Sequence, residues 1–262
     1  MRISFLLSIF LIISACNNKS SNKKEILNPK PNVILAHRNL TNFKTVTFPS
    51  KDSLTITADL YLIKKPKNFI LLCHQAGFSR AAYIEAAKKL NRLGYSCMAI
   101  DQRSGKIANN IINETAKLAK EKGLATKYLD AKPDIETAID YAYKLNNGKI
   151  ILVGSSYSAS LSLLLATTND KVKAVAAFSP GEYLNGINLT ESISSLNKPT
   201  FVTSSKKEIE QVTGIIKNVK SDVVIHFKPK VKGIHGSRAL WKETRGNNTY
   251  WKAFTDFLSL VE

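Results

Sequence analysis

The segment KIILVGSSYSAS, residues 149–160, contains the most informative pattern in the chain. Its apolar half, residues 149–153, predicts a buried strand, and the small residues that follow predict a sharp turn into a helix. A serine at such a turn is held out as a nucleophile when the residues two before and two after it are small, which gives the pattern G-x-S-x-G. This register places Gly154, Ser156 and Ser158, so Ser156 is the predicted nucleophile.

Other interpretations of this segment are open. Ser158 stands where the pattern has glycine, although its side chain is small. Ser155 is a rival nucleophile, but that register would put the β-branched Val153 where the turn requires glycine. The segment also fits a plain Gly-Ser turn at a strand end. The partners available to Ser156 elsewhere in the chain therefore decide the matter.

A serine nucleophile needs a general base, and His235 has the most suitable position among the four histidines. It lies in the sequence GIHG, between the last predicted strand and the last predicted helix. His37 lies in the N-terminal approach, His226 lies within an apolar strand, and His74 follows an early strand. His235 is therefore the candidate base.

The third member of such a triad is a carboxylate that orients the imidazole. It should follow a strand that lies between Ser156 and His235 in the chain. Glu208 and Glu182 both satisfy this condition, and either one would otherwise be a solvated surface carboxylate.

Short apolar runs recur along the chain with helical patterns between them, which is typical of a mostly parallel sheet with helices on both faces. We expect eight strands, at residues 44–48, 54–63, 69–73, 95–100, 149–153, 172–178, 200–203 and 223–227. Helices are expected at residues 81–93, 113–122, 133–145, 161–167, 209–217 and 250–260. The predicted fold class is therefore α/β, with an open eight-stranded sheet.

The segment 109–129 is longer than a minimal crossover between two strands requires. An extra segment beside the carboxyl end of a sheet either covers a pocket there or decorates the surface.

The first residues predict export. Arg2, an apolar stretch over residues 3–13 and small residues before Cys16 resemble a bacterial lipoprotein signal peptide, in which Cys16 becomes the lipidated N-terminus. The alternative is an ordinary secretory signal with a cysteine near its cleavage site. The apolar stretch is shorter than the roughly 20 residues that span a bilayer. Asn17 provides no acidic cue for inner-membrane retention, so the outer membrane is favoured.

These features divide the chain into three parts. We expect a signal peptide over residues 1–15, a flexible tether over residues 16–32 and one α/β domain over residues 33–262.

The formal net charge of +18 raises the question of an anionic partner. The lysines are scattered rather than gathered in one arm with aromatic residues, so we expect no nucleic-acid partner. Two interpretations of the charge remain: a basic surface near anionic lipid or polysaccharide, or ordinary solvated lysines.

Cys73 and Cys97 lie in apolar runs and are expected to be reduced core residues. The sequence contains no metal or cofactor motif.

Taken together, Gly154-x-Ser156-x-Ser158, the HQAG sequence after an early strand and the late GIHG sequence resemble the α/β-hydrolase superfamily. The resemblance runs from about residue 45 to the C-terminus. The short chain and the segments 101–105 and 128–136 are similar to dienelactone-hydrolase-like and acyl-esterase-like members. Dienelactone hydrolases proper use a cysteine nucleophile, so the serine here does not imply that specific activity.

The resemblance implies a serine hydrolase that cleaves a carboxylic ester or thioester of a small molecule through an acyl-enzyme, without cofactor or metal. Members with this chain order more often take the acid after the later strand, which favours Glu208 over Glu182. The implied oxyanion hole consists of the backbone N–H of Tyr157 and that of Gln75 or Ala76.

Two other functions fit the same pattern. One is a lipid-anchored binding protein that kept the fold and lost turnover, and the other is an acyltransferase or peptidase that uses the same triad.

Overall fold

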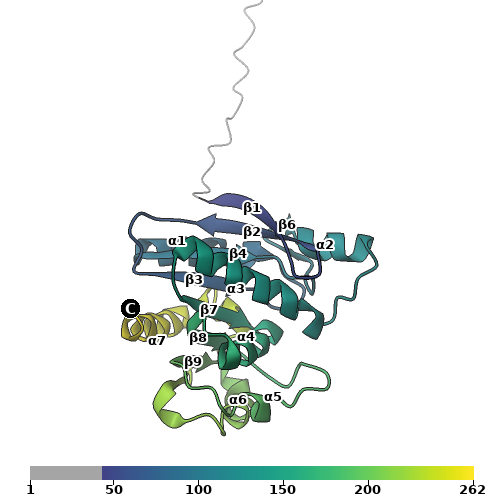
Figure 1. Ribbon diagram of the computed structural model, residues 1–262. Coiled ribbons are helices and arrows are strands. Elements are labelled where there is room, and N and C mark those ends of the chain that lie inside the picture. The colour runs from purple at the N-terminus through teal and green to yellow at the C-terminus, as the bar shows by residue number, and fades with distance from the viewer. Residues whose placement is uncertain (1–42) are drawn as a thin grey trace, which may run out of the picture. The chain divides into compact units, whose positions relative to one another are not determined.

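Eight strands form one sheet in the order β1-β2-β4-β3-β7-β8-β9-β10, and the computed structural model describes residues 43–262. The strands are β1 (Lys44–Pro49), β2 (Thr55–Tyr61), β3 (Asn68–Cys73), β4 (Tyr95–Ile100), β7 (Ile150–Ser155), β8 (Val172–Phe178), β9 (Thr200–Thr203) and β10 (Val224–Phe227). β2 pairs antiparallel with β1 and β4, and the other pairs are parallel. The sheet runs from β1 at the top of Figure 1 to β9 near the bottom. The predicted strands are confirmed to within about two residues at their ends.

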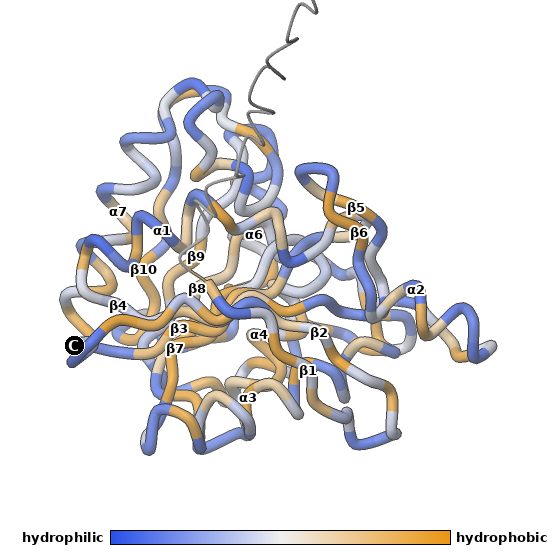
Figure 2. Tube along the Cα trace, turned by 90° about the horizontal axis from the view of Figure 1, so that it is seen from above, coloured by the Kyte–Doolittle hydropathy of each residue, from blue (hydrophilic) through white to orange (hydrophobic). Residues whose placement is uncertain are grey.

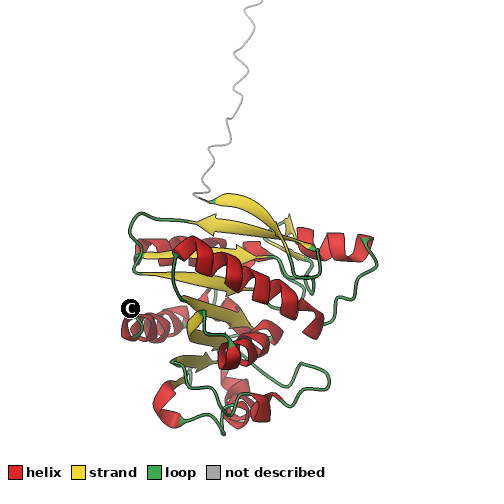
Figure 3. Ribbon diagram, viewed as in Figure 1, coloured by secondary structure: helices red, strands yellow, loops and turns green. Residues whose placement is uncertain are grey.

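The helices cover both faces of this sheet (Figure 3). They are α1 (Ile84–Arg92), α2 (Glu114–Glu121), α3 (Lys132–Asn146), α4 (Tyr157–Thr168), α5 (Leu189–Ser192), α6 (Ile209–Ile215) and α7 (Asn247–Leu260). α3, α4 and α6 share one apolar cluster with one face of the strands, and α1 and α7 share a second cluster with the other face. Figure 2 shows α3 on one side of the apolar strands and α1 and α7 on the other. The predicted α/β class, with helices on both faces, is confirmed.

The central strands are buried on both faces, which explains why their sequences are continuous apolar runs rather than alternating ones. Every residue of β3, β4 and β7 is buried. Cys73 and Cys97 are buried and free in this core, as the sequence predicted.

Four elements differ most from the prediction. α4 begins at Tyr157, directly after the β7 turn, rather than at residue 161, because small serine residues form its buried first turn. The short strands β5 (Ile107–Ala108) and β6 (Ile111–Ile112) form a separate hairpin, and α5 is a single turn. Elements this short lack a periodic pattern in the sequence.

The predicted signal peptide, the tether with Cys16 and His37 lie outside the described residues. Within residues 43–262, none of the helices has the length and apolar character needed to cross a membrane.

Candidate active site

Ser156 occupies the sharp turn between β7 and α4. Its backbone has φ 58° and ψ −124°, a conformation that residues other than glycine rarely adopt. Its N–H donates to Phe178 O at 2.8 Å. A Cβ on Gly154 would lie 2.3 Å from Ser158 O, so the close approach of strand and helix requires glycine there. The turn has the geometry of a nucleophile elbow.

Ser158, where the pattern has glycine, is used by the turn. The Ser155 N–H donates to Ser158 Oγ at 2.9 Å, and Ser158 Oγ lies 2.9 Å from Cys73 O and from Ser155 O. The hydroxyl therefore ties the start of α4 to the ends of β3 and β7. Serine at this position therefore adds hydrogen bonds that glycine could not make.

Ser155, the rival nucleophile, contacts the histidine loop. It is fully buried, and its Oγ accepts the N–H of Ser237 at 2.8 Å. Ser237 lies two residues after His235, in the 3-10 helix η5 (Gly236–Leu240). Ser155 thus holds the histidine loop against the end of β7.

His235 and Glu208 are in contact, although they come from different loops. His235 Nδ1 is hydrogen-bonded to Glu208 Oε1. Glu208 Oε2 accepts the Ser205 N–H at 3.0 Å, the Ser205 hydroxyl at 2.7 Å and the Ser179 hydroxyl at 3.0 Å. Burial opposes ionisation of Glu208, but the bonds from His235 and Ser205 outweigh it and lower the pKa of the carboxyl to about 2. The carboxylate is therefore charged at neutral pH.

Ser179, which the sequence interpretation missed, joins the two loops. Its hydroxyl donates to Glu208 and accepts the Gly236 N–H at 2.9 Å. Its own backbone has φ 55°, so the loop after β8 is bent to bring this hydroxyl into place. No sequence motif marks Ser179, because its role depends on two loops far along the chain.

Glu182, the alternative acid, lies elsewhere. Its Oε2 accepts the Leu189 N–H at 2.7 Å, and its Oε1 accepts the N–H and hydroxyl of Thr190 at 3.1 and 3.0 Å. These bonds cap the start of α5. The structure thus brings Glu208, and not Glu182, to His235.

The loop after β3 is held by His74. This side chain is fully buried, its Nε2 accepts the Gln102 N–H at 3.0 Å, and its Nδ1 lies 2.9 Å from Gln75 O. Burial lowers the pKa of His74 to about 4, so the ring is neutral and serves to fix the loop. Within residues 43–262, the N–H groups of Gln75, Ala76 and Tyr157 have no hydrogen-bond acceptor, as an oxyanion hole would require.

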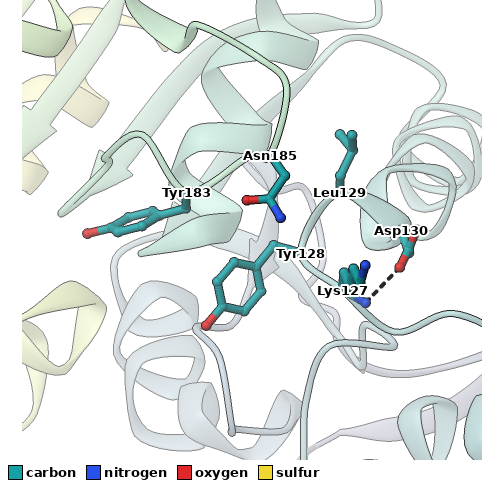
Figure 4. A pocket seen from close by; sticks show the side chains of 6 residues that line it. All are labelled: Lys127, Tyr128, Leu129, Asp130, Tyr183 and Asn185. Carbon is teal, nitrogen blue, oxygen red and sulfur yellow. Dashed lines mark hydrogen bonds between the residues drawn. The ribbon is translucent and has the colours of Figure 1, made fainter.

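A pocket of 480 Å³ lies between the segment 127–130 and the loop after β8. Its lining residues are Lys127, Tyr128, Leu129, Asp130, Tyr183 and Asn185, and Figure 4 shows their side chains around one space. We call this the tyrosine pocket. The Tyr128 ring stacks on the ring of Tyr157, the residue that directly follows Ser156, so the pocket adjoins the candidate nucleophile. The segment 109–129 was predicted either to cover a pocket or to decorate the surface. Its last residues line this pocket.

The model of the dienelactone hydrolase family matches residues 57–226. The chain therefore belongs to the dienelactone hydrolase family, within the α/β-hydrolase superfamily.

Solved structures share the fold. An esterase from Pyrococcus furiosus is 16% identical, with a TM-score of 0.67 over 84% of this chain and 92% of that chain. A dienelactone hydrolase from Anabaena variabilis is 13% identical, with a TM-score of 0.64 over 84% of this chain and 97% of that chain. An α/β hydrolase from a Penicillium species is 12% identical, with a TM-score of 0.62 over 84% of this chain and 98% of that chain. No curated protein matched the chain.

Proposed function

We propose that this protein is a serine-dependent hydrolase of small-molecule carboxylic esters or thioesters, with Ser156, His235 and Glu208 as its triad. The observation that carries the proposal is the pairing of His235 with an ionised Glu208, in a loop that is bonded to Ser155, the residue next to the elbow serine Ser156. Membership of the dienelactone hydrolase family supports the same class of reaction.

In the first half of the reaction, Ser156 Oγ attacks the carbonyl carbon and its proton passes to His235 Nε2. Glu208 accepts the Nδ1–H of His235 and stabilises the imidazolium that forms. The carbonyl oxygen becomes an oxyanion, which accepts the N–H of Tyr157 and that of Gln75 or Ala76. Each such donor stabilises the transition state by about 3 to 4 kcal/mol.

In the second half, the tetrahedral intermediate expels the alcohol or thiol, which takes the proton from His235 Nε2. Water then attacks the acyl-enzyme while His235 removes its proton, and the C–O bond to Ser156 breaks. Ser156 recovers the proton, and the carboxylic acid leaves.

The test is labelling of the full-length chain with a fluorophosphonate probe, together with turnover of p-nitrophenyl acetate. Ser156→Ala and His235→Ala should abolish both signals. Ser155→Ala is the matched control, because it removes a neighbouring hydroxyl that bonds Ser237; it should still label and turn over at a reduced rate. Circular dichroism melts check that each variant is folded.

Failure of the folded wild-type chain to label would refute the hydrolase and favour a binding protein. Labelling without ester turnover would redirect the search to acyl transfer or peptide bonds.

We also propose that the protein is exported and anchored through a lipid on Cys16, with the outer membrane as the favoured location. The signal-like sequence before Cys16 supports this proposal. Growth with an alkyne fatty acid should label the wild-type chain and not Cys16→Ala, while Cys97→Ala, a change at a buried cysteine, should keep the label. Equal labelling of wild type and Cys16→Ala would contradict it.

A further inference from the structure

The tyrosine pocket lies next to the start of α4, which follows Ser156 and carries the proposed oxyanion donor Tyr157. The Tyr183 N–H donates to Gly181 O at 2.8 Å, and the same Gly181 O accepts the hydroxyl of Ser160 in the first turn of α4 at 2.7 Å. The Tyr128 ring stacks on the Tyr157 ring, with centroids 4.7 Å apart and 15° between the planes. The N–H of Tyr157 is a proposed oxyanion donor. A carbonyl bound at Ser156 therefore has this pocket directly beside it.

The position of His235 decides which half of an ester the pocket receives. The leaving alcohol must lie against His235 Nε2, because this nitrogen returns the proton to it. Among the described residues, those that line the tyrosine pocket come from segments 127–130 and 183–185, and none comes from the histidine loop. This arrangement favours the acyl group over the alcohol as the occupant of the pocket.

The lining residues decide its chemistry. Two tyrosine rings and Leu129 supply the apolar part of the wall, beside the polar Lys127, Asp130 and Asn185, and the volume lies within the roughly 300–1,000 Å³ of small-molecule sites. One face of the Tyr128 ring is covered by Tyr157, but Tyr128 remains 40% exposed, so it offers aromatic surface to a ligand. Aromatic rings favour stacked or edge-to-face contacts at such surfaces.

We propose that the tyrosine pocket binds the acyl group of the ester and that this acyl group carries an aromatic ring. This inference rests on the proposed function, and it adds the class of substrate.

Hydrogen bonds hold the pocket in shape before a ligand arrives. The Ser104 hydroxyl lies 2.9 Å from Thr126 O and 2.6 Å from Lys127 O, which fixes the backbone before Tyr128. Gln102 Nε2 donates to the Tyr157 hydroxyl at 3.2 Å beneath the stacked rings. On the opposite wall, a Cβ on Gly181 would lie 2.6 Å from the Tyr183 ring, so this ring packs on the backbone of its own loop. A pocket fixed in this way loses little entropy on binding.

The experiment compares p-nitrophenyl esters of acetate, octanoate and 3-phenylpropanoate on the full-length chain. The wild-type kcat/KM should be at least about tenfold higher for 3-phenylpropanoate than for acetate. Leu129→Trp should fill the pocket and lower this ratio by about tenfold. Tyr128→Ser should remove the stacking surface and lower the ratio by about three- to tenfold.

Leu124→Trp is the matched control, since Leu124 is an exposed leucine of the same segment outside the pocket lining, and its ratio should equal that of wild type. An unchanged ratio in Leu129→Trp and Tyr128→Ser, with Ser156 still labelled by the fluorophosphonate, would overturn the pocket and leave the proposed function standing. A preference for octanoate over 3-phenylpropanoate would contradict the proposal that the acyl group carries an aromatic ring. Loss of labelling and of all ester turnover in the folded wild type would overturn both proposals.

Discussion

The loops after β8 and β9 each carry a glutamate a few residues beyond a parallel strand, but the two carboxylates do different things. Glu182 accepts backbone and hydroxyl hydrogens at the start of α5. Glu208 accepts bonds from Ser205 and Ser179 and still presents one oxygen to His235. The role of a carboxylate in such a loop therefore depends on the groups that the loop places around it, and not on its distance along the chain from a strand.

Among the changes that test this contrast between the two loops, Glu208→Gln should have the largest effect. The amide keeps the size of the side chain but cannot hold a charged imidazolium, so kcat/KM for p-nitrophenyl acetate should fall by about 10³ to 10⁴. Steady-state hydrolysis measures the change, and the melting curve of the variant reports whether it is folded. A fall of less than about tenfold would remove Glu208 from the proposed triad.

A smaller loss is expected from Ser179→Ala, which removes one bond to Glu208 and the acceptor of the Gly236 N–H. Ser179 is a positioning residue, and one hydrogen bond to a charged group corresponds to a fall in kcat of about tenfold. The acid limb of the pH–kcat profile should also move, because the bond network around Glu208 changes. Ser179→Thr keeps a hydroxyl and should restore part of the rate; equal rates for Ser179→Ala and wild type would contradict the role.

The same contrast predicts a pH effect on stability. The pKa of Glu208 is about 2 in the folded chain, below its ordinary value of 4.5. Its contribution to stability is therefore complete above about pH 4.5 and is lost as the pH falls toward 2. Between pH 5 and 3 the free energy of unfolding of wild type should fall by on the order of 2 kcal/mol more than that of Glu208→Gln.

Urea unfolding at these two pH values gives the difference. Other carboxylates titrate in both chains, so they cancel. Parallel pH dependences would mean that Glu208 has no special stabilisation in the folded state.

The smallest effect is expected from Glu182→Gln. Because Glu182 only caps a one-turn helix, kcat/KM should stay within about twofold of wild type and the free energy of unfolding should fall by no more than about 1 kcal/mol. The same ester assay and urea titration apply to this variant. A loss of activity comparable with that of Glu208→Gln would reverse the assignment of the two loops.

Much of the fold could be predicted because its signals are local. Apolar runs bounded by turn residues located the central strands of the main sheet, since strands buried on both faces exclude charge along their length, and an alternating pattern located β1 and β2. Gly154 was recognisable for the same reason, because strand and helix approach within the same short segment. The start of α4 was missed because its first turn, Tyr157 to Ser160, is buried on all sides and shows no helical periodicity of polar and apolar residues.

The α/β class, the turn around Ser156 and the two glutamates that could face His235 were all predictable from the amino-acid sequence. The tertiary structure decided that Glu208 contacts His235, that Ser155 holds the histidine loop and that Tyr128 and Tyr183 share one pocket. The physical reason is range: strand and turn preferences act over a few neighbouring residues, whereas these contacts join loops that only the parallel sheet brings to one edge.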